Sequence, residues 1–160
     1  ELADIIYHDG DERNSRKIAR NIEKHRTQKK IESTIELAKI IKKSFPSKYY
    51  KKHPATKTFQ AIRIFINNEI QELHAGLNQA FNLLRENGKI CVFTFHSIED
   101  RLVKNFTNKV CLRNKKTKLI KPSSKEILSN PRSRSAKLRV IKRERLNFNY
   151  IPISELGFEL

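Results

Sequence analysis

Residues that can do chemistry gather directly after a short apolar run in the middle of the chain. They are His96, Ser97, Glu99, Asp100 and Arg101. The run predicts a strand and the residues after it predict a helix, and ligands of open α/β sheets bind where a strand ends and a helix begins. A helix N-terminus at Ser97 can receive a phosphate or a carboxylate, and Arg101 can pair with a phosphate. The structural alternative is that Ser97 only caps the helix, that the acidic pair complements the helix dipole, and that His96 is satisfied within the loop.

A second polar set lies along one side of the helix predicted after the dipeptide His53-Pro54. It consists of His53, Lys57, Gln60 and Arg63, and the last three follow one another at intervals of a helical turn. The set either lines a binding cleft or is a solvated face, with Pro54 as a helix-start residue.

The charge balance indicates what these basic residues meet. The chain has 34 Lys and Arg against 17 Asp and Glu, a formal charge of +17 and a pI of about 10.1. A nucleic acid is the partner that fits best, because each cation that neutralises a phosphate releases a counterion. Arg132 and Arg134, which alternate with serines ahead of a predicted strand, can hold backbone phosphates or can form an ordinary basic loop. An anionic membrane surface and the basic drift of an AT-rich genome are the weaker explanations of the charge.

The remaining composition narrows the class of protein. Cys91 and Cys111 lack the spacing of a metal site or a disulfide framework, and are expected to be buried or idle thiols. The longest apolar run, 90–95, is far too short to span a membrane, and no charged-then-apolar leader opens the chain, so a cytoplasmic protein without a membrane partner is expected. The chain contains no Met and begins at Glu1, which we interpret as part of a longer protein.

The first half of the chain predicts helices with basic outer faces. Residues 12–25 place apolar side chains on one side and basic ones around the rest, which suits a short amphipathic helix. A second helix is predicted for 33–44, where Ser33 and Glu36 have the spacing of a capping box. Its expected inward residues are Ile35, Ala38 and Ile41. Apolar residues then recur every three or four positions over 59–84, which predicts one long helix or two nearly collinear ones.

The second half predicts an α/β domain. Residues 89–95 form a continuous β-branched and aromatic run, typical of a strand buried on both faces of a parallel sheet. Residues 97–110 are helical again, and 136–143 predict a strand with one wet face. The residues expected on that face are Lys137, Arg139 and Lys142. The stretch 147–160 has no clear period and is expected to be loosely ordered.

Three segments, in this order, resemble the bacterial 16S rRNA cytosine-N4 methyltransferase family, known as RsmH or MraW. They are HPATKTFQAIRI at 53–64, FHSIEDRLVK at 95–104 and NPRSRSAKLR at 130–139. The opening DGDER at 9–13, with the basic helix behind it, agrees with the same family. The resemblance covers all but about the last fifteen residues.

The resemblance implies a Rossmann-like methyltransferase fold interrupted by an inserted helical domain. On that map residues 1–75 belong to the helical insertion, residues 76–146 supply the later strands of the methyltransferase sheet, and 147–160 form the tail. The family's cofactor loop and the residues nearest the reacting methyl group lie on earlier strands, so the resemblance places them before Glu1. This chain has only four glycines, none in a glycine-rich turn between a strand and a helix, so no cofactor-binding residue is assigned to it.

The activity that the resemblance implies is transfer of a methyl group from S-adenosylmethionine to the exocyclic N4 of a cytidine in 16S rRNA of the small ribosomal subunit. This amine is a poor nucleophile, so positioning matters more than acid strength. The base must leave its stack, and its pocket needs polar groups for the base edge and cations for the flanking phosphates. His96 can then contact the base or the backbone. The chain alone is expected to be inactive, and a homo-oligomer is compatible with the sequence.

Two other functions compete with this one. A non-catalytic RNA-binding module would need only the charge and the basic helices. A nuclease would use His96, Glu99 and Asp100 as acid/base or metal groups, but adjacent carboxylates on a helix point in different directions and no second acidic cluster is evident.

Overall fold

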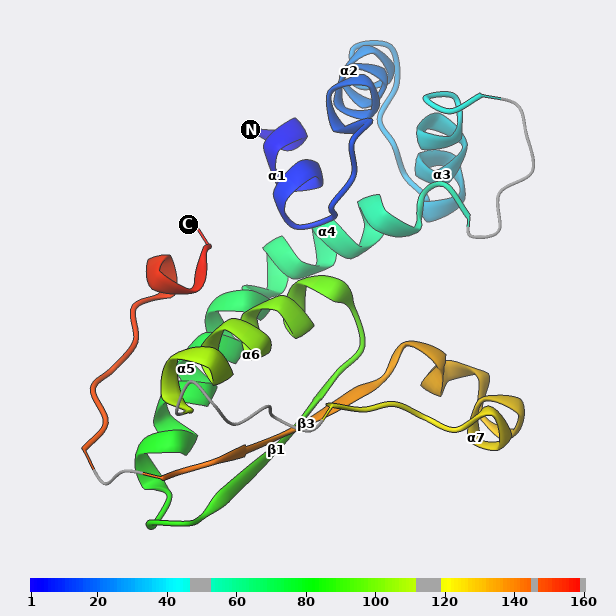
Figure 1. Cartoon of the computed structure of the whole chain (residues 1–160). Helices are drawn as coiled ribbons and strands as arrows, with labels where there is room; N and C mark the ends of the chain where they lie inside the picture. Colours follow the sequence, from blue (N-terminus) through cyan, green and yellow to red (C-terminus); the bar gives the residue numbers. More distant parts are fainter. Residues whose placement is uncertain (47–52, 112–118, 145–146, 159–160) are drawn as a thin grey trace. The chain divides into compact units, whose positions relative to one another are not determined.

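The computed structural model describes residues 1–46, 53–111, 119–144 and 147–158 (Figure 1). The chain divides into two compact units, Glu1–Glu69 and Ile70–Leu160. Each unit has its own core, and each is described by itself. No helix in the described ranges is both long and apolar enough to cross a membrane.

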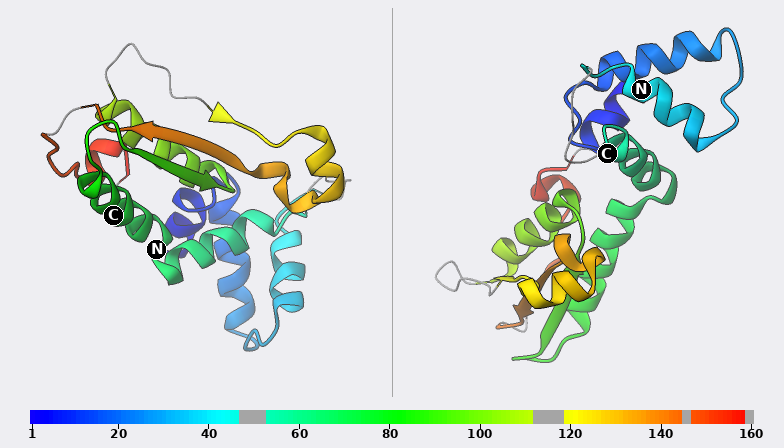
Figure 2. Two further views of the ribbon diagram at one scale, coloured as in Figure 1. Left: turned by 90° about the horizontal axis from the view of Figure 1, so that it is seen from below. Right: turned by 90° about the vertical axis from the view of Figure 1, so that its right-hand side faces the viewer.

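The first unit is helical. Its elements are α1 (Leu2–His8), α2 (Ser15–Arg26), α3 (Thr34–Lys42) and α4 (Thr56–Asn67). The second helix packs against α1 and α3, and α1 also packs against α4 (Figure 2). Five isoleucines fill the space between these helices, with exposed fractions of 5% or less. They are Ile6, Ile18, Ile22, Ile40 and Ile41.

The third helix confirms one expectation and corrects another. The Ser33 hydroxyl accepts a hydrogen bond from the Glu36 amide at 3.1 Å, so Ser33 is the N-cap. Ile35, however, is 67% exposed, and the buried face of α3 is centred on Ile40 and Ile41. Ile41 is buried as expected and Ala38 packs partly against the core, so only Ile35 was assigned to the wrong side; four apolar residues near the end of the helix allow two neighbouring faces.

A close approach of α1 and α4 requires glycine at position 10. A Cβ atom there would lie 2.6 Å from the carbonyl oxygen of Ile6 and 2.8 Å from that of Lys57. The next residue, Asp11, has φ = 49°, and its carbonyl accepts a hydrogen bond of 2.6 Å from Lys57 Nζ. These contacts fix the turn that leads into α2.

The apolar pattern over 59–84 corresponds to two helices. Asn68 adopts the left-handed conformation, with φ = 51°, at the end of α4, and α5 (Glu69–Leu83) begins at the next residue. Asparagine tolerates this conformation better than most residues, which is why it can end a helix here.

The second unit pairs three strands with helices. Its further elements are β1 (Lys89–Thr94), α6 (Ser97–Val110), β2 (Leu119–Ile120), α7 (Ser124–Ser129), the 3-10 helix η1 (Pro131–Ser135), β3 (Lys137–Lys142) and the 3-10 helix η2 (Ile153–Leu156). The strand order is β1-β3-β2, and both pairs are antiparallel. The fold of this unit is therefore α/β, with α6 packed along β1 and β3 (Figure 2).

The first strand differs from its expected form. It is at one end of the three-stranded sheet and is antiparallel to β3, so a parallel sheet was the wrong expectation for this pair. Val92 and Thr94 are buried, whereas Cys91, Phe93 and Phe95 on the alternate positions are exposed, the two phenylalanines at 62% and 57%. A continuous apolar run cannot by itself reveal which of its faces is covered.

The third strand reverses the expected wet face. Arg139 and Ile141 are buried on the side that packs against α6, at 8% and 0% exposure, while Leu138 and Val140 are half-buried on the opposite side. The strand was identified correctly, but Arg139 was assigned to the wrong face, and Lys142 shares the face of Leu138 and Val140 instead of alternating with them. An arginine can occupy the inner face only because a carboxylate of α6 meets it there.

Residues 147–158, for which loose order was expected, pack against α5 and α6. Leu156 is fully buried, and its carbonyl accepts a hydrogen bond of 2.8 Å from Asn105 Nδ2. The Ile151 carbonyl lies 2.7 Å from His74 Nε2, and Asn78 Oδ1 accepts from the Ile151 amide at 2.9 Å. Contacts made by single, irregularly spaced residues produce no hydrophobic periodicity, so the sequence pattern could not predict them.

Leu156→Ala should lower the free energy of unfolding by about 2–5 kcal/mol, because it removes a fully buried side chain and leaves a cavity. Leu128→Ala is the matched control, since Leu128 is 85% exposed; it should change stability by less than about 0.5 kcal/mol. Urea unfolding followed by circular dichroism measures both. Equal stability of the two variants would contradict the docking of this segment.

Candidate functional site

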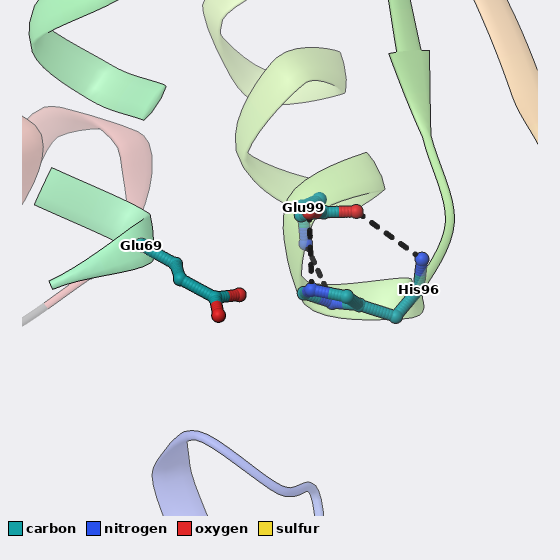
Figure 3. A group of neighbouring side chains, drawn as sticks. All are labelled: Glu69, His96 and Glu99. Atoms are coloured by element: carbon teal, nitrogen blue, oxygen red, sulfur yellow. Dashed lines mark hydrogen bonds and ion pairs between the residues drawn. The ribbon is translucent and has the colours of Figure 1, made fainter. Parts of the chain in front are cut away.

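The turn between β1 and α6 is held closed by reciprocal hydrogen bonds between His96 and Glu99 (Figure 3). His96 is the N-cap of α6, and its Nδ1 accepts from the Glu99 amide at 3.3 Å. In return, a Glu99 carboxylate oxygen accepts from the amides of Phe95 at 2.8 Å and His96 at 3.3 Å. The cap is therefore His96 and not Ser97, which is the first residue of the helix. Histidine rarely caps a helix, so the residue type does not predict that its ring would do so.

The same contacts define the chemistry of the pair. His96 Nε2 lies 3.2 Å from Glu99 Oε1. Because Nδ1 accepts a hydrogen bond, the neutral ring carries its proton on Nε2, where it faces this carboxylate. Burial raises the pKa of Glu99, but the hydrogen bonds from the His96 ring and the Phe95 amide outweigh it, so the pKa lies below its ordinary value. The pair is fixed in one arrangement.

Asp100 fastens α6 to β3. Its two carboxylate oxygens accept hydrogen bonds from Arg139 Nε at 2.9 Å and from Lys137 Nζ at 2.6 Å. Burial raises its pKa, and the hydrogen bonds of these two cations outweigh that effect, so the net pKa is lowered. Asp100 was expected to contact substrate, but here its carboxylate is engaged in an internal ion pair on the inner side of the sheet.

Ser97 and Arg101 remain on the surface of α6. The guanidinium carbon of Arg101 lies 5.1 Å from the centroid of the Phe158 ring, a cation–π distance. The C-terminal segment therefore helps to orient Arg101. No sequence motif marks Phe158, so its contact with Arg101 could not be predicted.

The two arginines ahead of β3 are exposed on η1. Between them, Ser133 is buried at 6% exposure, and its hydroxyl donates to the Asn130 carbonyl at 2.8 Å. With Ser133 turned inward, Arg132 and Arg134 present their guanidinium groups to solvent. The segment, for which either phosphate binding or an ordinary basic loop was expected, is a 3-10 helix of five residues.

The polar set of α4 belongs to the first unit, and most of it makes local contacts. His53 Nδ1 accepts from the Ala55 amide at 3.2 Å, which is a capping contact before the helix, and Lys57 binds the Asp11 carbonyl. Arg63 forms a two-pronged ion pair with Glu69, with distances of 2.7 and 2.9 Å. Gln60 is half-buried. These contacts give three members of the set a structural role.

Within the second unit, the predicted residues separate into two sides of α6. Glu99 and His96 close the turn, and Arg101 lies on the outer surface, whereas Asp100 points to the sheet. Glu99 lies against His96 and Asp100 lies against two cations of β3, so these adjacent carboxylates do not form the acid/base pair that a nuclease would need. The partners of Asp100 are Lys137 and Arg139, which were predicted to lie on the solvent-exposed face of the strand.

Comparison with known proteins gives one family. The model of the MraW methylase family matches residues 1–144. Ribosomal RNA small subunit methyltransferase H of Wolbachia pipientis wMel is 50% identical over 149 residues, which are 89% of this chain and 48% of that protein. The protein of the same name from Anaplasma marginale (strain Florida) is 49% identical over 149 residues, 89% of this chain and 50% of its own. The chain spans about half the length of the curated relatives it matches.

The internal ion pair makes a prediction about pH. The folded-state pKa of Asp100 is lowered, so its stabilising contribution is complete above the unfolded pKa of about 4 and is lost as the pH falls through the folded value. Asp100→Asn should cost about 1.5–3 kcal/mol of unfolding free energy at pH 7. The difference from wild type should shrink below about pH 4.

Denaturant titrations between neutral pH and pH 2.5 measure this difference. Glu72→Gln, at an exposed position of α5, removes a carboxylate without touching the pair and should follow the wild-type curve. A gap between wild type and Asp100→Asn that stays constant down to pH 2.5 would exclude the ion pair as its cause.

Proposed function

Because the chain belongs to the MraW methylase family, we propose that it is part of an enzyme that methylates the N4 of a cytidine in 16S rRNA of the small ribosomal subunit. The observation that carries this proposal is the family match over 144 residues, with relatives near 50% identity whose printed names are ribosomal RNA small subunit methyltransferase H. The non-catalytic RNA-binding module has only the basic charge in its favour. We place the reaction in the cytoplasm, where ribosomes work.

The methyl donor of the proposed reaction is S-adenosylmethionine, and the residues of this chain do not fit it. A nucleoside cofactor needs close backbone approach in a strand-to-helix turn, which glycine permits. The turn between β1 and α6 has no glycine and is closed by His96 and Glu99. Gly76 lies inside α5 and Gly88 in the turn before β1. We therefore assign the cofactor to the part of the longer protein that this chain lacks.

An exposed face of the sheet also supports the proposal that the cofactor-binding part lies outside this chain. Phe93 and Phe95 project from the side of β1 opposite α6, where Leu138 and Val140 of the neighbouring strand are also partly exposed. An α/β sheet normally buries both faces beneath helices. We propose that the cofactor-binding part of the protein covers this face and extends the sheet beyond β1.

The residues proposed to meet RNA lie on the outer side of α6 and on η1. Cytosine N4 is a weak nucleophile, so the contribution expected of this chain is to hold the target nucleotide in position. Arg101 is proposed to bind a phosphate next to the flipped base, with Arg132 and Arg134 on phosphates further along. His96, fixed by Glu99, would shape the rim of the base pocket.

The RNA contacts expected of the polar residues on and before α4 remain part of the proposal, but with a smaller role. Lys57 and Arg63 keep their charges while they hold their internal partners, so they can attract RNA without a direct role. His53 and Gln60 are proposed to contact RNA on the first unit. Asp100 is proposed to act only through the position of α6, because its carboxylate is already bound.

Arg101→Ala in the longer protein should reduce methylation about 10- to 100-fold, the loss expected for one charge-assisted hydrogen bond of about 1.5–3 kcal/mol. Mass analysis of rRNA nucleosides measures N4-methylcytidine in a host that lacks its own enzyme and is complemented with each variant. Lys104→Ala is the matched control, since Lys104 is exposed on the same helix three residues later.

Two outcomes would count against the proposal. If the wild-type longer protein restores no N4-methylcytidine, the assigned reaction is wrong. If Arg101→Ala and Lys104→Ala both retain wild-type methylation, Arg101 does not touch the substrate.

A further inference from the structure

One side of α6 contacts the segment 155–158 at three successive turns of the helix. Three helix residues make these contacts at intervals of four positions, and such intervals return to the same side of a helix. The helix residues are Arg101, Asn105 and Lys109. Their partners, in the same order, are Phe158, Leu156 and Glu155. The segment therefore runs antiparallel to α6 and ends with its aromatic ring beside Arg101.

The contact of Leu156 is the main anchor of this segment on the helix. Asn105 Nδ2 donates to the Leu156 carbonyl at 2.8 Å, and the Leu156 side chain is fully buried. Lys109 Nζ donates to a Glu155 carboxylate oxygen at 3.0 Å, but both side chains are about half exposed, so this ion pair adds little. The buried leucine fixes the residue from which the chain continues to Phe158.

Gly157 turns the chain between this anchor and the ring. It ends η2 with φ = 76° and ψ = 34°, and its amide donates to the Ser154 carbonyl at 3.0 Å. A positive φ is easy for glycine and unfavourable for a residue with a Cβ atom. A Cβ atom here would meet no atom closer than 3.9 Å, so the requirement for glycine comes from the backbone conformation and not from a lack of space. The direction in which Phe158 leaves η2 depends on this residue.

The contact with Phe158 is compatible with phosphate binding by Arg101. The cation is attracted to the face of the ring, with the guanidinium carbon 5.1 Å from the ring centroid. Phosphate is bound by N–H groups, of which the planar guanidinium has five. One arginine can therefore make both contacts at once.

A restrained arginine binds phosphate at a lower entropic cost than a free one. Arg101 is exposed on α6, and a long exposed side chain gives up most of its rotamers when it binds. A contact that restricts these rotamers beforehand reduces this loss. The family model ends at residue 144, so the segment that supplies this contact lies beyond the matched residues.

We propose that Phe158 is a positioning residue of the proposed methyltransferase. Its ring holds the Arg101 guanidinium in one orientation, and the turn at Gly157, anchored by Leu156, holds the ring in place. This inference rests on the proposed function, in which Arg101 binds a phosphate next to the target base. Phe158 itself touches no substrate and acts through Arg101.

The test measures steady-state methylation of small ribosomal subunits by the longer protein. The subunits come from a host that lacks its own enzyme, and the methyl group of S-adenosylmethionine is radiolabelled. Phe158→Leu, which keeps an apolar side chain but removes the ring, should raise the KM for subunits about 2- to 5-fold, the range of a cation–π contact at an exposed site. The kcat should stay the same, because a phosphate contact is equally strong before and during methyl transfer.

Two further substitutions separate orientation from packing. Phe158→Trp should keep the KM at or below the wild-type value, because Trp is the best cation–π partner. Tyr150→Leu is the matched control: it removes a ring of the same segment that is 63% exposed and contacts His74 instead of Arg101, so it should leave the KM unchanged. Circular dichroism checks that each variant is folded.

A double-mutant cycle identifies the residue through which Phe158 acts. In an Arg101→Ala background, Phe158→Leu should change the KM by less than about 1.5-fold, because the two residues would contribute through one contact. A loss of the same size in both backgrounds would show that the ring acts by packing, and would overturn the inference.

Gly157→Ala tests the same contact with the ring retained. It strains the left-handed turn and should displace Phe158, so its KM should rise as it does for Phe158→Leu. Wild-type KM values for both variants would refute the inference and leave the proposed function intact. Absence of methylation by the wild-type longer protein would instead refute the proposed function, and with it the role assigned to Phe158.

Discussion

The reciprocal hydrogen bonds between His96 and Glu99 are the constraint on which the second unit depends. They close the turn after β1 and fix the residue at which α6 begins. That starting point sets the register of α6, which in turn places Asp100 opposite Arg139 on the sheet and Arg101 on the outside. A helix that began one residue later would rotate by about 100° and exchange these roles. The division between a structural side and a surface side of α6 therefore originates in one cap.

Much of the fold could be predicted from the sequence, because most elements carry a strong period or a capping residue. The apolar spacing of α2 and the Ser33 cap of α3 identified these helices, and the alternation of β3 identified the strand. What could not be predicted was which face of each strand is covered. Arg139 is a charged residue that is buried because Asp100 pairs with it. A pattern of residue types does not reveal the partner that compensates a buried charge.

The location of the candidate site could be predicted, but the roles of its residues could not. The segment 95–104 stands out by its place between a strand and a helix, whereas the role of each residue in it depends on the three-dimensional structure. Asp100 became an internal ion-pair partner and His96 became a cap, since side-chain direction in a turn depends on backbone angles that local sequence does not fix. The docked segment that ends near Phe158 had no signal at all, because its anchors are single residues with non-periodic spacing.

A rigid turn is also what the proposed reaction demands of this half of the protein. Catalysis by positioning tolerates errors of less than about 1 Å, and a turn closed by hydrogen bonds on both sides meets that requirement better than a mobile loop. Under the proposed function, this chain positions the RNA, and the methyl donor is bound by the part of the longer protein that lies outside it.

The most direct measurement is the ¹⁵N NMR spectrum of the His96 imidazole in labelled chain, assigned with His96→Gln. Of the two tautomers of the uncharged ring, the one with the proton on Nε2 and an unprotonated Nδ1 is expected, together with a slowly exchanging Glu99 amide. Glu99→Gln should retain this tautomer more weakly, since an amide oxygen still faces Nε2. A ring that averages between tautomers, or one with its proton on Nδ1, would contradict the closed turn and the arrangement of α6 that follows from it.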